Sequence, residues 1–159
     1  MADPVADLGS SMLAGVRALA PLGVREMHSD ALTRDWRYPS TALSVRSMRR
    51  DLRPFLMSSD LPDAEVDDLV LAACEAAANG IEHAQHPTEP FFDVQAEVEG
   101  RQVRIVVRDY GRWTMRRVGP GHRGRGLRMM TTLAAVCLTS GPLGTSVTLR
   151  NLVDGRSGG

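Results

Sequence analysis

The sequence predicts an α/β two-layer sandwich, in which a mixed, mostly antiparallel sheet carries helices on one face. The first observation is a hairpin: residues 91–99 alternate in polarity, a Glu-Gly-Arg turn follows, and residues 102–109 are typical of a buried strand. The second is that helical patterns are grouped before and after this hairpin. A doubly wound parallel sheet would instead alternate single strands with helices, so helices on one side of a layered sheet are favoured.

The chain before the hairpin contains one extended segment and two helical segments. Residues 31–38 favour a strand, and a helix is predicted over about 43–52. Pro54 is expected to end or kink that helix, because proline lacks a backbone N–H and clashes with the preceding turn. A second, longer helix is predicted over 62–84, where it begins at a Pro-Asp pair and is stopped by two later prolines.

The chain after the hairpin is predicted to form a loop, a helix and a final strand. Residues 112–123 are polar and contain glycine, which favours a mobile loop. Gly-Arg-Gly at 124–126 then opens a helix over 127–139, and residues 146–152 are typical of a closing strand. The predicted order is therefore strand, helix, long helix, hairpin, loop, helix and strand.

The length of 159 residues predicts one domain of ordinary size with short additions. We place the domain at 31–153, an N-terminal extension or linker at 1–30, and a flexible tail at 154–159. Apolar residues at 43% and charged residues at 24% are typical of globular proteins. No run approaches the roughly 18 apolar residues of a membrane span. The N-terminus carries acids where a secretion signal carries bases. A cytoplasmic protein is expected.

The two cysteines indicate the same compartment. Cys74 and Cys137 lie in apolar stretches without the spacing of a disulfide or metal site, which suits a reducing environment. We expect both to be core residues.

The charged residues are unevenly distributed, although the formal net charge is zero. Acids and no arginines occupy the stretch between Pro54 and Gly100, whereas 101–128 holds nine arginines against Asp109. This asymmetry favours a surface for a protein or an anionic ligand over a nucleic-acid grip, which would show overall basicity. The alternative is that the acidic and basic stretches are only solvated surfaces, whose opposite charges balance in the folded protein.

The chain contains no lysine. This excludes the P-loop, which needs Gly-Lys-Ser/Thr, and the eukaryotic-type protein kinase, which needs a strand lysine on the phosphates. Any nucleotide chemistry must use another design.

The predicted long helix carries a polar line in an alanine-rich setting. Glu75, Asn79 and His83 are spaced i, i+4, i+8 and project from nearly the same face. Small neighbouring residues let a ligand or another backbone approach closely. The alternative is a polar stripe on an amphipathic helix, and His83 is more typical of a helix end than of a ligand.

Two glycine motifs follow on other predicted elements. Asp109 ends a predicted strand, and Gly111 frees the chain to turn just after it. Gly124 and Gly126 open a predicted helix, where unpaired N–H groups and the positive end of the helix dipole favour phosphate. Each motif alone is weak, because glycine often marks only a turn.

In this order, the three motifs resemble the N, G1 and G2 boxes of the GHKL ATPase superfamily, whose domain has the Bergerat fold. The nearest resemblance is to anti-sigma-factor serine/threonine kinases, which lack the insertions of the gyrase, Hsp90 and MutL relatives. It covers about 31–152, including the late segment Gly144-Thr145-Ser146-Val147.

The resemblance implies a role for each motif residue. Asn79 is expected to bind Mg²⁺, because its amide oxygen suits a hard cation that also holds the triphosphate of ATP. Glu75 is expected to be the general base that accepts the proton of a protein serine or threonine hydroxyl. Asp109 is expected to accept a hydrogen bond from the adenine amino group, and Gly111 to let the ring pass close to the backbone.

The later motifs are expected to complete the nucleotide site. Gly124 and Gly126 would cradle phosphates together with Arg125 and Leu127, and Thr145 would support the adenine site. The loop over 112–123 would act as a lid, with the arginines at 123 and 125 as candidates for neutralising γ-phosphate charge. One departure is Trp113, which stands where many relatives have a second glycine.

The resemblance also implies partners. It predicts an ATP- and Mg²⁺-dependent kinase that binds a sigma factor and phosphorylates a STAS-domain anti-sigma-factor antagonist. It predicts a homodimer formed through the early strand and helix, with no direct nucleic-acid or membrane binding. The alternatives are a non-catalytic ATP-binding module that sequesters a partner, and a fragment of a multidomain regulator. The catalytic domain of a sensor histidine kinase is disfavoured, because His28 lacks the context of a phosphoacceptor.

Overall fold

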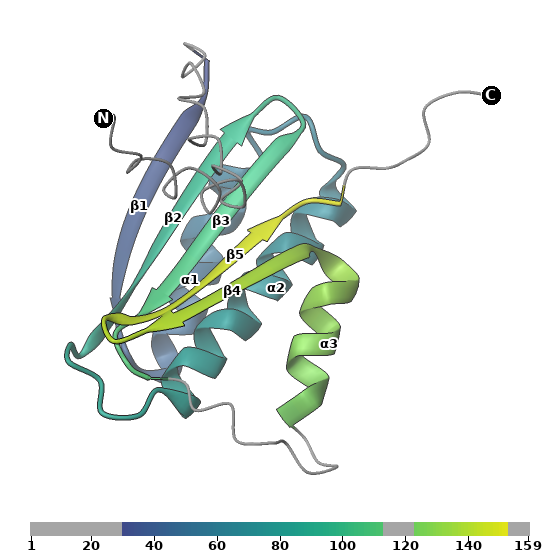
Figure 1. Cartoon of the computed structure of the whole chain (residues 1–159). Coiled ribbons are helices and arrows are strands. Elements are labelled where there is room, and N and C mark those ends of the chain that lie inside the picture. The colour runs from purple at the N-terminus through teal and green to yellow at the C-terminus, as the bar shows by residue number, and fades with distance from the viewer. Residues whose placement is uncertain (1–29, 113–122, 153–159) are drawn as a thin grey trace, which may run out of the picture.

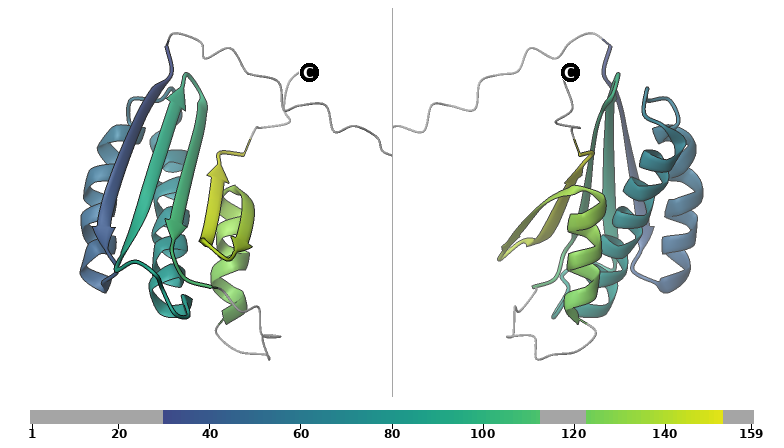
Figure 2. Two further views of the ribbon diagram at one scale, coloured as in Figure 1. Left: turned by 60° about the vertical axis from the view of Figure 1, so that its left-hand side comes forward. Right: turned by 90° about the vertical axis from the view of Figure 1, so that its right-hand side faces the viewer.

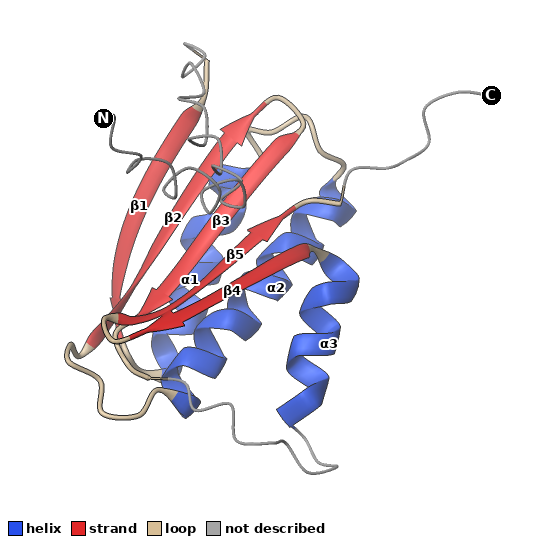
Figure 3. Cartoon of the chain, in the orientation of Figure 1, coloured by secondary structure: helices blue, strands red, loops and turns tan. Residues whose placement is uncertain are grey.

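A computed structural model of the chain describes residues 30–112 and 123–152. These residues form five strands and three helices (Figures 1 and 3). In chain order the elements are β1 (Leu32–Pro39), α1 (Ala42–Leu56), α2 (Asp63–His83), β2 (Phe91–Glu99), β3 (Gln102–Asp109), α3 (Arg123–Leu133), β4 (Ala135–Gly141) and β5 (Gly144–Arg150). Within these ranges, no helix is long and apolar enough to cross a membrane.

The strands form one sheet with the order β1-β2-β3-β5-β4, and every neighbouring pair is antiparallel among the described residues. All three helices cover one face of this sheet, as the edge-on view in Figure 2 shows. Helix α1 contacts β1 and β2, α2 contacts β3 and β5, and α3 contacts β4. The predicted two-layer α/β sandwich is confirmed, with a sheet that is antiparallel throughout its described part.

The core lies between the sheet and the helices, and the period-two alternation of the strands builds it. Alternate residues of β2 and β3 face the helices and are buried, whereas their neighbours are on the uncovered face. The buried set on these strands is Phe92, Val94, Ala96, Val98, Val103, Ile105 and Val107. Helix α2 presents buried alanines at 72, 73, 76 and 77, whose small side chains bring its backbone close to the sheet.

Helix α1 continues past Pro54, where the sequence predicted an end or a kink. Pro54 lies in the last turn and is exposed, so the helix loses one backbone hydrogen bond near an end that frays in any case. Leu56, one residue before the C-cap, is fully buried. Burial of Leu52 and Leu56 on one face therefore outweighs the effect of the proline.

The helix predicted over 127–139 is correct only as far as Leu133. Helix α3 begins four residues earlier and ends at Leu133, and Ala135–Gly141 forms strand β4. Val136 and Leu138 pack against the core, alternating with exposed residues, and β4 pairs with β5 along its whole length. The expectation for Cys137 is also wrong, because a strand turns this side chain to the uncovered face, where it is exposed. Cys74 packs against the core on α2 as expected, and burial raises the pKa of its thiol.

Several predictions fall outside the described residues. The extension over 1–29, most of the predicted lid including Trp113, and the tail from 153 onward are not covered, so the predicted domain limits stay predictions.

Candidate functional site

Helix α2 brings the first predicted motif to the helical layer, beside α3 and the ends of β3 and β5. Glu75 and Asn79 are half-buried, one helical turn apart, and Gly80 directly follows Asn79. Residues four apart on a helix lie on the same face. The predicted base and the predicted metal ligand therefore share one side of α2.

Glu75 lies against the first turn of α3. A Cβ atom placed on Gly126 would lie 2.0 Å from Glu75 Oε1 and 2.9 Å from Glu75 Cδ. Real Cβ atoms do not approach other atoms this closely, so the carboxylate occupies space that any side chain at 126 would need. The structure thus places Glu75 against the glycine-rich helix start where the sequence predicts phosphate.

Asp109 lies against α2 on another side of the helix. Asp109 ends β3 and is only 7% exposed, and its Oδ1 accepts a hydrogen bond from the Gly111 N–H at 2.9 Å. A Cβ on Gly80 would lie 3.1 Å from Asp109 Oδ2, which is tighter than nearly all real Cβ contacts. Glycine at 80 therefore lets the carboxylate lie against the helix beside Asn79.

The chain that follows Asp109 is joined to the C-terminal end of α2. A Cβ on Gly111 would lie 2.4 Å from the Ala84 Cβ, so the side of Gly111 that a side chain would occupy packs on α2. Gln85 and Arg112 exchange two backbone hydrogen bonds of 3.0 Å each, and the Thr88 N–H donates to the Tyr110 carbonyl at 3.0 Å. These bonds fix the direction in which the chain leaves the site toward the predicted lid.

Strand β5 supplies the other wall around Asp109. Thr145 is paired in register with Asp109 and is fully buried. Its hydroxyl lies 3.0 Å from Ser140 Oγ and 3.4 Å from the Gly111 carbonyl oxygen. Gly144 has φ = +127°, and a Cβ there would lie 2.2 Å from the Asp109 carbonyl oxygen. Thr145 therefore lies beside Asp109, and its role at an adenine site stays a prediction.

The predicted residues follow one another along a short stretch of α2. Gly126 contacts Glu75 at one end, and Asp109 contacts Gly80 at the other, with Asn79 between them. Gly80 is five positions after Glu75, which is a rise of about 7.5 Å along a helix axis. This stretch of α2 thus joins a helix N-terminus to a buried carboxylate.

The remaining predicted residues lie in the first turns of α3. Gly124 and Arg125 belong to its first turn, although the Arg123 and Arg125 side chains are outside the described structure. Leu127 is 40% exposed. The first turn of any helix carries N–H groups without partners inside the helix, so this segment suits an anion whichever side chains it bears.

Two residues of the site were missed by sequence reasoning. Gly80 and Gly144 both lie directly against Asp109. Gly144 belongs to the late segment that carries part of the resemblance, but neither glycine was expected to have a role of its own in the site. Gly80 carried a weak signal, because glycine inside a predicted helix costs about 1 kcal/mol relative to alanine and usually has a packing reason.

The uncovered face of the sheet carries a separate cluster next to the site. Arg37 forms a two-bond ion pair with Asp93 at 2.7 and 3.0 Å, and the Tyr110 hydroxyl also donates to Asp93. The Arg37 hydrogen bond, with the Tyr110 bond as a smaller cause, lowers the pKa of the Asp93 carboxyl. Because Tyr110 follows Asp109, this cluster holds the end of β3 from the opposite face.

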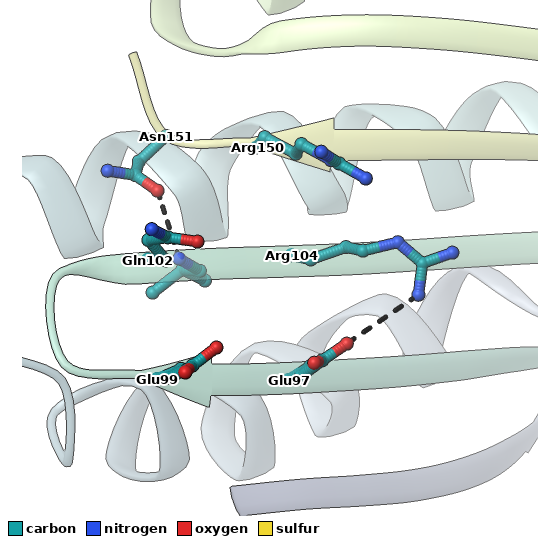
Figure 4. Close-up of a pocket in the computed structure, with 7 residues that line it drawn as sticks. Glu97, Glu99, Gln102, Arg104, Arg150 and Asn151 are labelled. Atoms are coloured by element: carbon teal, nitrogen blue, oxygen red, sulfur yellow. Dashed lines mark hydrogen bonds and ion pairs between the residues drawn. The ribbon is translucent and has the colours of Figure 1, made fainter. Parts of the chain in front are cut away.

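A small hollow of about 200 Å³ lies at the other end of β3 (Figure 4). Asn151 closes it by accepting from the Val103 N–H at 2.9 Å and donating to the Arg101 carbonyl at 3.0 Å. Arg104 reaches Glu97 at 3.9 Å. None of the predicted site residues lines this hollow, and its hydrogen bonds join the end of β5 to β3.

The donor set along α2 fits a nucleotide with a hard cation. It combines a helix N-terminus for phosphate, an amide side chain for a cation, and a buried carboxylate with a hydroxyl beside it at the far end. These features define the class as a nucleotide-binding α/β domain without a P-loop.

Residues 38–151 match the family described as "Histidine kinase-like ATPase domain". The match covers more than half of the chain, so the chain belongs to this family of ATP-binding domains. The predicted GHKL resemblance is thereby confirmed.

One solved structure shows the same fold. The crystal structure of the RsbU and RsbW domains of Rv1364c from Mycobacterium tuberculosis is similar, with a TM-score of 0.59 and 26% identity over 74% of this chain. The match covers 32% of that chain, so our chain spans about a third of the length of this relative. The histidine kinase domain and the longer blue-light activated histidine kinase of Erythrobacter litoralis EL346 follow. They show 19% and 22% identity, cover 71% and 58% of this chain and 60% and 31% of theirs, and have TM-scores of 0.46 and 0.42.

Proposed function

We propose that this chain is an ATP- and Mg²⁺-dependent protein serine/threonine kinase of the anti-sigma-factor type, which binds a sigma factor and phosphorylates a STAS-domain antagonist. The observation that supports it most is the contact between Glu75 and Gly126, which puts a carboxylate at the helix start suited to phosphate. A general base must lie within reach of the hydroxyl that attacks the γ-phosphate. A domain that only binds ATP does not need a carboxylate there.

Each residue of the site has one role in this proposal. ATP, when bound, supplies the phosphoryl group. Asn79 holds the cation, the N–H groups of the first turn of α3 bind phosphate, and Asp109 with Thr145 binds the adenine end. Glu75 Oε accepts the proton of the substrate hydroxyl as the hydroxyl oxygen attacks the γ-phosphorus, and the bond between that phosphorus and the bridging oxygen breaks so that ADP leaves. Because Glu75 and Asp109 contact different ends of the same helix segment, the two ends of the nucleotide would be held in one frame.

The partner assignment has separate support. It comes from the resemblance of the three motifs to anti-sigma-factor kinases and from the likeness to a structure that includes an RsbW domain. The proposed homodimer is supported by β1, which pairs only with β2 among the described strands and so leaves one edge open to a second copy.

The test is a transfer assay with Mg²⁺-ATP and candidate STAS proteins, followed by mapping of the phosphorylated residue. Glu75→Gln keeps the size of the side chain and removes its basicity, so transfer should fall by about 10²-fold or more. Nucleotide affinity should change less than about threefold. Glu82→Gln is the matched control, because Glu82 is exposed two turns further along α2, where its carboxylate lies 3.7 Å from His83 Nε2.

Two results would overturn parts of the proposal. Unchanged transfer by Glu75→Gln would remove Glu75 as the base. Wild-type protein that binds ATP and a sigma factor, yet phosphorylates none of the STAS proteins, would favour the non-catalytic sequestering module.

A further inference from the structure

We infer that Gly126 is a positioning residue for Glu75: the missing side chain at 126 makes the space in which the Glu75 carboxylate is held against α3. The packing relation stands on geometry alone. Its consequence for phosphoryl transfer rests on the function proposed above.

The geometry concerns the whole end of the Glu75 side chain. A Cβ on Gly126 would lie 2.0 Å from Oε1, 2.9 Å from Cδ and 3.3 Å from Cγ. Three bonded atoms of the Glu75 side chain thus lie within 3.3 Å of the position that a Cβ at 126 would occupy. A methyl group at 126 must displace something, and the three nearest atoms all belong to the flexible end of Glu75.

Helix α3 cannot easily retreat instead. Met130 lies one turn after Gly126 and is fully buried in the core, as are Ala72 and Ala76 of α2. Moving α3 away from α2 would open a gap around Met130, which costs packing energy. Rotation of the Glu75 side chain is the cheaper response, so the carboxylate and not the helix would move.

The location also suits a carboxylate group. Gly126 is the fourth residue of α3, within the turn whose N–H groups have no partners inside the helix. A carboxylate is stabilised near a helix N-terminus by these groups and by the helix dipole. Displacing Glu75 therefore removes the base from a place that both packing and electrostatics favour.

This role differs from the phosphate cradle expected of Gly126. A cradle uses the backbone of residue 126 and acts on the nucleotide, so its loss appears in nucleotide affinity. A positioning role acts on Glu75, so its loss appears in the rate of transfer from bound nucleotide and vanishes when the Glu75 side chain is absent.

The test is a double-mutant cycle of Gly126→Ala and Glu75→Ala, with Gly141→Ala as the matched control because a Cβ at 141 has no neighbour within 4 Å. Gly126→Ala should lower kcat for phosphoryl transfer by about 10²-fold, the effect of misplacing a catalytic group by about 1 Å. KM for ATP and nucleotide affinity should change less than about threefold. In the Glu75→Ala background, Gly126→Ala should lower the residual transfer no further. An equal loss of nucleotide affinity in both backgrounds, or an unchanged kcat, would overturn the inference.

A thermal-stability cycle separates this inference from the proposed function. In the Glu75→Ala background the clash is absent, so alanine at 126 should raise Tm by about 2–4 °C through its helix propensity. In the wild-type background the same change should give a smaller rise or a fall. If Glu75→Ala leaves transfer unchanged, the proposed base is wrong, and this coupling in Tm then decides the packing relation. Equal Tm shifts in the two backgrounds would refute it.

Discussion

Replacing Gly144 by alanine should destabilise the fold at the end of the candidate site. Gly144 has φ = +127°, and its Cβ would meet the Asp109 carbonyl oxygen at 2.2 Å and Tyr110 Cα at 3.0 Å. Both are backbone atoms of the strand end that carries the predicted adenine acceptor. Neither can turn aside as a side chain can, so β5 and β3 must separate.

The magnitude follows from two costs. A side chain in a sparsely populated backbone region costs about 1–3 kcal/mol. Overpacking against atoms that cannot move costs about 1–3 kcal/mol more. Together they give about 2–6 kcal/mol, a large part of the 5–15 kcal/mol of a typical domain. At roughly 4 °C per kcal/mol, Tm should fall by about 8–24 °C.

The assay is urea and thermal unfolding followed by circular dichroism, and Gly141→Ala is the matched control. Gly141 is paired with Gly144 across the same hairpin turn, but a Cβ there meets nothing within 4 Å. Its replacement should change the free energy of unfolding by no more than about 1 kcal/mol, because fewer unfolded conformations remain to be lost. A loss below about 1 kcal/mol for Gly144→Ala, or equal losses for the two variants, would refute the reasoning.

Three further predictions concern single side chains. Asp109→Asn should lower adenine-nucleotide affinity by about tenfold or more in calorimetry, because a neutral amide is a weaker acceptor for the adenine amino group; unchanged affinity would contradict the adenine assignment. Thr145→Val should cost about 1 kcal/mol in urea unfolding and weaken nucleotide binding, whereas Thr148→Val on the uncovered face should do neither; equal effects would be evidence against the buried hydroxyl. The lowered pKa of Asp93 in the folded state means that its contribution to stability is present above its ordinary value of 3.8 and is lost as pH falls through the folded pKa. Arg37→Ala should therefore reduce the fall in stability below about pH 4 in acid titrations, and an unaltered acid profile would refute that link.

The sequence predicted the elements whose pattern is local. Strands β2 and β3 have the predicted bounds, because their alternation and the turn between them are both encoded within 20 residues. Strand β4 was missed because the run from Leu127 to Thr139 has no breaker where the helix ends. That segment becomes a strand through pairing with β5 and burial of Val136 and Leu138, which a local pattern does not reveal.

The site divides in a similar way. The residues that carry chemistry are polar groups at recognisable spacings, so Glu75, Asn79 and Asp109 could be predicted from the sequence. Gly80 and Gly144 act through what touches them, namely a carboxylate and a carbonyl on a strand distant in the sequence. Such a contact depends on how closely α2 and β5 pack against the end of β3, and the sequence pattern does not reveal that distance.

The contacts of both carboxylates depend on how closely α2 packs against the sheet and α3. Glu75 meets a glycine on α3, and Asp109 meets a glycine on α2 itself, so each contact crosses one of the two interfaces of this helix. The buried alanines of α2 set how closely it approaches the sheet and α3. A larger side chain at Ala76 would push α2 away from its neighbours. Both contacts, Glu75 with Gly126 and Asp109 with Gly80, would then loosen together. Changes in the alanine face of α2 should therefore disturb the positions of Glu75 and Asp109 together. Changes at Gly126 or Gly144 should disturb only one of these two carboxylates.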